Sequence, residues 1–170
     1  MIEVTKTHVF FFKDWLSNFH VAPFEMITCD TTYKRFTTSE QAFMYQKALW
    51  FKDHEIAKKI LESKTPAEAK ALGRIVHNYV EEDWELVRYD FMYSCNYHKY
   101  DYNPELKSKF LDRRFANKTF VEASPFDPIW GIAVDRKRFG LDYLDDESNW
   151  KGRNLLGKVL TQVYKDFTET

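Results

Sequence analysis

The stretch TSEQAFMYQKALWF, residues 38–51, decides the fold predicted for this chain. Thr38 stands where a helix N-cap belongs, and Gln41 completes a capping box in which the two side chains bond each other's backbone N–H groups. A helix is therefore predicted over about residues 39–51. Its buried stripe follows from three- and four-residue spacing and comprises Ala42, Phe43, Gln46, Leu49 and Trp50.

Similar signals extend the helical pattern beyond this stretch. A helix is predicted over Asp53–Glu62, and a capping box at Thr65 and Glu68 begins a short helix that ends at Gly73. Further helices are predicted over residues 81–97, from Pro104 to about 115, and after Asn154, and short strands over 8–12, 119–123 and 129–134. We expect a mainly α fold with a few short β-strands, in one domain over residues 1–170.

Composition narrows the classes of function. The chain of 170 residues has 18% aromatic residues and a formal net charge of −1, so no uniform positive field draws it to a phosphate backbone. A cleft with a few Arg and Lys side chains for one phosphorylated group stays compatible with that charge. The many rings are explained first by a ring-rich core, and second by contacts with planar heterocycles.

Cysteine content and hydropathy predict the cellular compartment of the protein. Cys29 and Cys95 lack metal-ligand spacing, so we expect two free thiols and a reducing, cytoplasmic compartment. No leader-like segment or membrane span is expected, and no protein partner is implied. The five His residues form no ligand pattern, so we expect neither a metal nor a cofactor.

Two polar residues on the first predicted helix are candidates for chemistry. Glu40 and Lys47 lie seven residues apart, which brings an acid and an amine to one helix face. The structural alternative is more common for such a pair, because a first-turn acid complements the helix dipole and a Lys is usually solvated. The pair becomes a catalytic candidate when other polar residues converge on it.

The segment VEASPFDPIWG, residues 121–131, holds the next candidate. Asp127 lies between two prolines and precedes Trp130 and Gly131, which suits a positioned acid or base beside a stacking ring. A tight turn in which Asp127 bonds its own backbone is the alternative. Farther on, Lys151, Arg153 and Asn154 precede a helix, where free backbone N–H groups and basic side chains are suited to a phosphate.

The order and spacing of these blocks resemble the NADAR family, also called YbiA-like, over nearly the whole chain. The blocks are Leu16–Phe19, Thr38–Phe43 with Lys47, Thr65–Arg74, Trp84 with Arg88 and Met92, Val121–Gly131 and Gly152–Gly157. One departure is Gln41, because His often follows the Glu of the family's motif. An imidazole at that place is therefore not essential in this chain.

The resemblance implies a compact, mostly helical hydrolase that cleaves N-glycosidic bonds of ribose. Two substrate types are associated with the family: ADP-ribose attached to the amino group of guanine, here in DNA or RNA, and phosphoribosylamino-pyrimidine intermediates of riboflavin biosynthesis. Both carry an exocyclic amine on the anomeric carbon, and such an aminal opens to an imine. A module that binds ADP-ribose or a nucleotide without cleaving it is the alternative from another class.

The resemblance also suggests residue roles. Glu40 would shuttle the proton that lets the base leave, and Lys47, as a neutral amine, would form a transient Schiff base with C1. In the competing hypothesis water attacks directly, with Glu40 or Asp127 as the base. The candidate substrate-binding residues are Trp84 and Trp130 for base stacking, Asn18 for the ribose, Lys151 or Arg153 for the phosphate, and Phe19, Arg88, Gly131 and Asn154 from the matched blocks.

Overall fold

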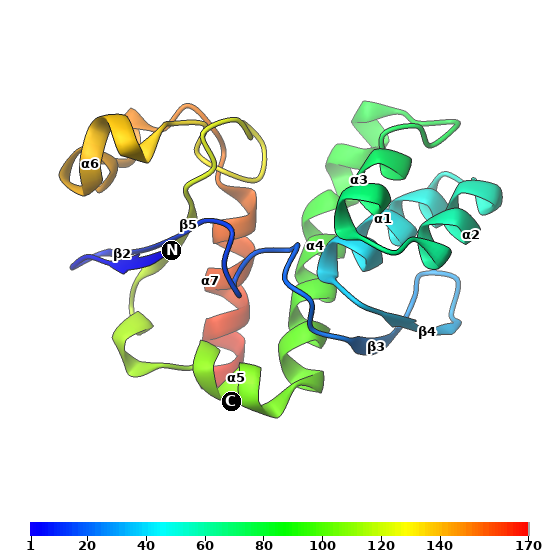
Figure 1. Cartoon of the computed structure of the whole chain (residues 1–170), viewed down its shortest axis with the longest axis horizontal. Helices are drawn as coiled ribbons and strands as arrows, with labels where there is room; N and C mark the ends of the chain where they lie inside the picture. Colours follow the sequence, from blue (N-terminus) through cyan, green and yellow to red (C-terminus); the bar gives the residue numbers. More distant parts are fainter. Residues whose placement is uncertain (170) are drawn as a thin grey trace. The chain divides into compact units, whose positions relative to one another are not determined.

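A computed structural model describes residues 1–169 as two compact units. Unit 2 comprises Asn18–Lys107, and unit 1 comprises Met1–Ser17 with the residues from Ser108 onward. Helices predominate in the described residues (Figure 1), which confirms the predicted fold class. The expectation of one domain stays a prediction.

Unit 2 is a group of helices joined to a β-hairpin. Its elements are β3 (Phe24–Ile27), β4 (Tyr33–Phe36), α1 (Ser39–Trp50), α2 (His54–Glu62), α3 (Pro66–Gly73) and α4 (Glu81–Tyr102). The helix α1 contacts α2, α3 and α4, and α4 also contacts β3. The antiparallel hairpin β3–β4 was missed in the sequence analysis.

The start of α1 confirms half of the predicted capping box. Thr38 is the N-cap and accepts a hydrogen bond from the backbone N–H of Gln41 at 3.1 Å. The Gln41 side chain instead accepts from the backbone N–H of Thr37 at 2.8 Å and donates to the carbonyl of Ile60 at 3.1 Å. Gln41 thereby ties the start of α1 to the end of α2.

The predicted single stripe of α1 is wrong, because ten of its twelve residues are buried. Lys47 is half-buried and Trp50 is 43% exposed, so these two mark the open side of the helix. The helices α2 and α3 confirm the predicted bounds to within a residue. The predicted helix from residue 81 continues past 97 to Tyr102, because Asn103 and Pro104 stop it only there.

Unit 1 is built on a three-stranded sheet. Its elements are β1 (Ile2–Val4), β2 (His8–Phe11), the 3₁₀ helices η1 (Arg113–Phe115) and η2 (Glu147–Asn149), β5 (Thr119–Glu122), α6 (Arg136–Leu144) and α7 (Leu155–Thr168), while α5 (Pro104–Phe110) leads in from unit 2. The strand β2 pairs antiparallel with β1 and parallel with β5, and α7 packs on β5. Residues from the strands and from the segment that follows β5 share one core, namely Phe10, Val121, Ala123, Ile132, Val134 and Leu144.

Two predictions for unit 1 are wrong. Residues 129–134 form no strand, because the Asp127 carboxylate accepts the N–H groups of Ile129 and Trp130 and bends the chain there. The predicted helix from Pro104 ends at Phe110 instead of near 115, and η1 follows it. Helix α6 was missed, since Gly140, with φ +73°, interrupts its helical pattern.

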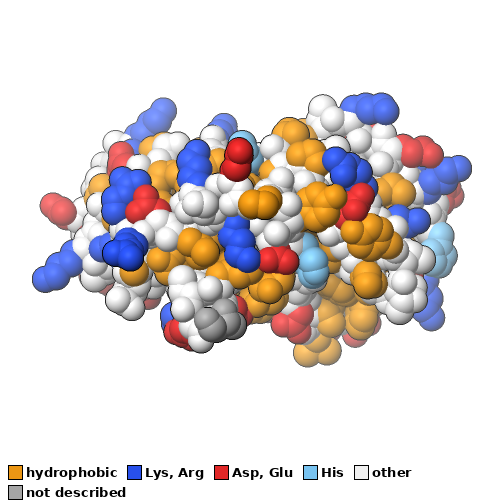
Figure 2. All heavy atoms as spheres, turned by 90° about the horizontal axis from the view of Figure 1, so that it is seen from below, with side chains coloured by type: hydrophobic (Ala, Val, Ile, Leu, Met, Phe, Trp, Pro, Cys, Tyr) orange, Lys and Arg blue, Asp and Glu red, His pale blue; other side chains and the backbone are white. Residues whose placement is uncertain are grey.

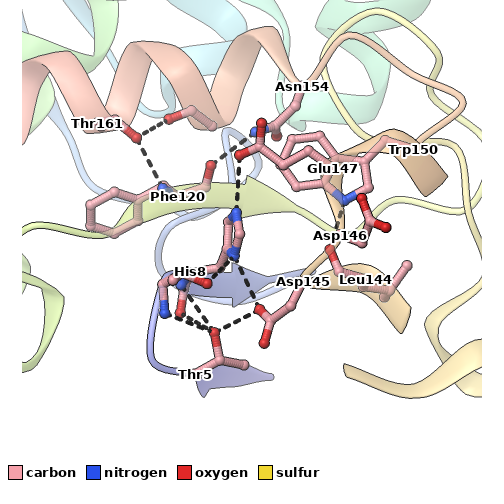
Figure 3. A network of polar contacts seen from close by, with 12 residues as sticks. Thr5, His8, Phe120, Leu144, Asp145, Asp146, Glu147, Trp150, Asn154 and Thr161 are labelled. Atoms are coloured by element: carbon pink, nitrogen blue, oxygen red, sulfur yellow. Dashed lines mark hydrogen bonds and ion pairs between the residues drawn. The ribbon is translucent and has the colours of Figure 1, made fainter. Parts of the chain in front are cut away.

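A polar network attaches the α6–η2 segment to the sheet (Figure 3). The buried His8 of β2 presents Nδ1 to Asp145 and Nε2 to Glu147, each at 3.0 Å from a carboxylate oxygen. Trp150 packs edge-on against His8 and donates its indole N–H to the carbonyl of Leu144 at 2.8 Å. The sheet therefore positions the chain that leads into α7.

Helix α7 is fastened to β5 by two side chains, Asn154 at its N-cap and Thr161 within the helix (Figure 3). Asn154, fully buried, accepts from the N–H of Glu122 at 3.0 Å and donates to the carbonyl of Phe120 at 2.9 Å. Thr161 accepts from the N–H of Phe120 at 2.9 Å. With φ +52°, Asn154 occupies the left-handed region, which Asn tolerates better than most residues.

The surface matches the small net charge. On the face seen in Figure 2, basic and acidic side chains alternate with apolar ones, and neither sign covers the face. Both cysteines are free, Cys29 exposed and Cys95 buried. Among the described helices none combines the length and hydropathy required to cross a membrane, and within residues 1–169 no three His, Cys, Asp or Glu side chains gather as a metal site.

We predict that Asn154→Ala lowers the free energy of unfolding by about 2–4 kcal/mol, because it leaves a buried N–H and a buried carbonyl unpaired and puts Ala at positive φ. Urea unfolding followed by circular dichroism measures the loss. Gln162→Ala on the exposed face of α7 is the control, with a change below about 0.5 kcal/mol. Equal stabilities for the two variants would contradict the structural role of Asn154.

Candidate active site

The first turn of α1 holds Glu40 in a buried setting. Its backbone N–H donates to the carbonyl of Asn18 at 3.1 Å, and the residue is only 7% exposed. The carboxyl group belongs to the first turn of α1, at the positive end of the helix dipole. The loop at Asn18 therefore covers the end of the helix that carries the candidate acid.

Asn18 connects three parts of unit 2. Its Oδ1 accepts from Ser39 Oγ and from Asn96 Nδ2, both at 3.2 Å, and its Nδ2 lies 3.0 Å from the Met92 sulfur. Ser39 belongs to α1, while Met92 and Asn96 belong to α4. The side chain is thus occupied in joining the loop to both helices. Its predicted contact with ribose stays a prediction.

Lys47 lies two turns after Glu40, on the open side of α1. Its Nζ donates to the carbonyl of Gly73 at 2.9 Å and lies 4.5 Å from the centre of the Tyr79 ring. A Cβ on residue 73 would lie 1.9 Å from the Met44 sulfur, so glycine permits the end of α3 to approach α1 this closely. The backbone thereby holds the amine in one place.

Burial and nearby charges lower the pKa of Lys47. Burial contributes most, followed by the positive charge of Arg88, whereas Glu81 and Glu40 act in the opposite direction and Arg74 adds to the lowering. Glu40 therefore lies within electrostatic range of the amine, as their spacing predicts. A lowered pKa is what nucleophilic use of a lysine requires.

Arg88 is a buried cation that interacts electrostatically with Lys47. It is 2% exposed and pairs with Glu81 at 2.5 Å and with Glu85 at 3.2 Å, all three on α4. Glu81 also accepts a hydrogen bond from the Tyr79 hydroxyl. Burial and this hydrogen bond raise the pKa of Tyr79 to about 12, so the phenol stays neutral. Tyr79, Glu81 and Arg88 form one network around the amine.

The rings of unit 2 divide into covered and exposed ones. Trp84 is 4% exposed and packs against Phe43, Phe51 and Phe91. Its predicted stacking on a base stays a prediction. Phe19 and Tyr79 are each 40% exposed. Tyr79 was missed as a candidate, because its contact with Lys47 depends on how the chain packs.

The remaining candidates lie in unit 1. Asp127 forms the tight turn that was the alternative reading, since one of its carboxylate oxygens accepts the N–H groups of Ile129 and Trp130 at 2.9 and 2.8 Å. Trp130 is half-buried and Gly131 buried, while Lys151 and Arg153 are exposed. A catalytic role for Asp127 stays a prediction.

The backbone part of the predicted phosphate site is wrong. The N–H groups of residues 151–156 all donate to carbonyls of residues 128–132, at 2.7–3.1 Å. None of these donors is left for a phosphate, because the loop is hydrogen-bonded to the Asp127 turn. A phosphate contact by the side chains of Lys151 and Arg153 stays a prediction.

Comparisons with known proteins identify relatives of this chain. Residues 9–168 match the family model described as NADAR domain, which extends over both units. The N-glycosidase R617 of Acanthamoeba polyphaga mimivirus is 37% identical over 134 residues, 79% of this chain and 76% of that protein. The riboflavin biosynthesis protein PYRR, chloroplastic, of Zea mays is 30% identical over 146 residues, 79% of this chain and 23% of that protein.

A solved structure shares the fold. The NMR structure of the E. coli protein YbiA superimposes with a TM-score of 0.71 at 25% sequence identity. The match covers 98% of this chain and 88% of that one. The predicted YbiA-like fold is therefore confirmed.

We predict that Arg88→Gln raises the pKa of Lys47, because it removes the positive charge that lowers this pKa most and releases Glu81 to act on the amine. NMR titration of protein with isotope-labelled lysine measures the shift. Arg74→Gln is the matched control and should raise the pKa less, since Arg74 contributes least. A pKa of Lys47 that stays the same or falls in a folded Arg88→Gln protein would show that burial alone sets it.

Proposed function

Because this chain belongs to the NADAR domain family, we propose that it is an N-glycosidase that separates a ribose from the exocyclic amine of a base. The observation that carries the proposal is the pairing on α1 of a buried carboxylate, Glu40, with a lysine whose pKa is lowered, Lys47. The relative named an N-glycosidase supports this reaction class.

The proposed reaction begins with opening of the sugar ring. Glu40 gives a proton to the ring oxygen as the bond from that oxygen to C1 breaks, and an imine forms between C1 and the nitrogen of the base. The neutral amine of Lys47 adds to C1, and the base leaves as its free amine with a proton relayed by Glu40. Water then hydrolyses the lysine imine, which restores the amine and releases the sugar.

Direct attack by water is the competing route. In it Glu40 takes a proton from the water, and Lys47 remains protonated and contacts the sugar or a phosphate. The carbonyl of Gly73 and the ring of Tyr79 both favour the ammonium form, so they suit this route. Burial and Arg88 favour the neutral amine and suit the covalent route.

The proposed substrate is ADP-ribose attached to guanine in nucleic acid. Asn18, whose carbonyl accepts from the backbone N–H of Glu40, would contact the ribose, and Phe19 would contact the base. Tyr79, exposed beside Lys47, is a further ring for the base. Action on a phosphoribosylamino-pyrimidine is the second candidate, which the maize relative named for riboflavin biosynthesis favours.

We predict that Glu40→Gln abolishes turnover of both substrate types, because an amide keeps the shape of the side chain but cannot relay a proton. Mass spectrometry of the released base measures turnover, and a melting curve verifies the fold. Glu55→Gln is the matched control, since Glu55 occupies the first turn of α2 and is exposed. Near-normal turnover by Glu40→Gln would reduce Glu40 to a structural role, and a parent protein that binds but never cleaves would favour the binding module.

We predict that borohydride added during turnover fixes a sugar-sized mass on the peptide that contains Lys47, because it reduces the imine. Lys47→Arg should bind ligand and be nearly inactive, since guanidinium stays protonated and forms no imine. The exposed Lys59 serves as the internal control for nonspecific labelling. An active Lys47→Arg protein together with an unlabelled parent would exclude the covalent route and leave direct attack by water.

A further inference from the structure

Helix α3 holds none of the site residues predicted from the sequence, yet its last residue accepts the side chain of Lys47. The carbonyl oxygen of Gly73 lies 2.9 Å from Lys47 Nζ, and α3 packs along α1 within unit 2 (Figure 1). The next residue, Arg74, is the C-cap of α3 and lies close enough to Lys47 for its charge to act on the amine. Groups at this end of α3 are therefore neighbours of Lys47.

Two cations, Lys70 and Arg74, lie one helical turn apart at this end of α3. Residues four apart on a helix are neighbours on its surface, which brings the two cations together. Lys70 Nζ lies 5.6 Å from the centre of the Phe19 ring, and Phe19 follows Asn18, whose carbonyl accepts from the N–H of Glu40. One cation thus lies beside the loop that covers the start of α1, and the other lies beside the amine on that helix.

Neither cation has a carboxylate partner in the part of the chain that the structure describes. Within residues 1–169 no carboxylate pairs with Lys70 or Arg74, whereas the buried Arg88 is paired with both Glu81 and Glu85. Lys70 is half-buried and Arg74 is exposed. Like charges one helical turn apart repel each other, so an anion bound between them stabilises both.

The carbonyl groups at the end of α3 do not oppose an anion. The carbonyls of residues 70–73 accept hydrogen bonds from the backbone N–H groups of Arg74 and Ile75 and from Lys47 Nζ, at 2.9–3.2 Å. The negative end of the helix dipole is therefore covered by donors, one of which is a cation. What this turn presents to a ligand is the positive charge of its side chains.

We propose that Lys70 and Arg74 bind the phosphate on C5 of the ribose whose N-glycosidic bond is cleaved. Both candidate substrates carry this phosphate, as part of the diphosphate in ADP-ribose and as a monophosphate in a phosphoribosylamino-pyrimidine. The guanidinium group offers a planar fork of donors that suits phosphate oxygens, and the lysine adds a point charge. The proposal rests on the proposed function and adds to it the residues that recognise the phosphate of the sugar.

This assignment keeps the phosphate away from Lys47. Arg74 remains charged at any pH near neutrality, so it attracts the phosphate in either reaction route. A phosphate held by α3 does not need the ammonium of Lys47 as its partner, so the amine is left to lose its proton and attack C1. C1 and C5 are opposite ends of the sugar, which suits an amine and a pair of cations that are neighbours.

NMR titration with ADP-ribose, ribose 5-phosphate and unphosphorylated ribose tests the proposal without any turnover. Lys70→Gln and Arg74→Gln should each weaken binding of the two phosphorylated ligands about 10-fold, because each removes a charge-assisted contact. Lys70→Arg should retain most of the affinity, since it retains the charge. Lys58→Gln is the matched control and should bind like the parent, because Lys58 is exposed on α2 of the same unit.

Unphosphorylated ribose is the control for the ligand, and it should bind the parent and both Gln variants equally weakly. Melting curves verify that the variants fold. Equal affinity of the parent and both variants for ADP-ribose would overturn the proposal, as would a loss of affinity that Lys58→Gln shares or that is as large for ribose. A parent protein that binds neither phosphorylated ligand would overturn it as well.

Turnover separates this inference from the proposed function. Binding of ADP-ribose that depends on Lys70 and Arg74, without cleavage of ADP-ribosylated guanosine or of a phosphoribosylamino-pyrimidine, would support the phosphate site and reject the reaction. Cleavage at rates that Lys70→Gln and Arg74→Gln leave unchanged would overturn the phosphate site and leave the N-glycosidase standing. Where both proposals hold, Lys70→Gln raises KM more than it lowers kcat, and the substrate with the larger kcat/KM identifies the source of the phosphate.

Discussion

The burial of α1 is the constraint on which the candidate site depends. Ten of its twelve residues are covered by neighbouring elements of unit 2, including the polar Ser39, Gln41 and Gln46. A buried polar group is costly unless it is hydrogen-bonded, and these three bond Asn18, the end of α2 and the backbone of Cys29. The same burial excludes water from Glu40 and lowers the pKa of Lys47.

The sequence predicted those helices that begin with a side chain suited to an N-cap. Thr38, Asp53 and Thr65 all accept a backbone N–H as N-caps, so α1, α2 and α3 begin where expected. Residues 129–134 have the composition of a strand, yet the carbonyls of residues 129–132 accept hydrogen bonds from the segment 151–156. That partner lies some twenty residues away, and no local pattern contains it.

The sequence predicted only the part of the candidate site that follows from local geometry. The spacing of Glu40 and Lys47 follows from helix geometry alone, so their common face was predictable. Which rings are covered depends on the neighbours that pack on them, and Trp84 proved buried whereas Tyr79 is exposed. The role of Gly73 also depends on packing, since it accepts Lys47 only because α3 ends against α1.

The two reaction routes require opposite charge states of Lys47, so the charges around it favour one route and oppose the other. The covalent route needs a neutral amine, so any phosphate of the substrate that comes near Lys47 works against it by raising its pKa. Arg88 opposes that effect, but Glu81 and Glu85 already neutralise part of its charge. The hydrolytic route gains from a nearby phosphate, because the ammonium then binds it. The covalent route therefore requires other cations to hold the phosphates, and the position of those cations relative to Lys47 selects between the routes.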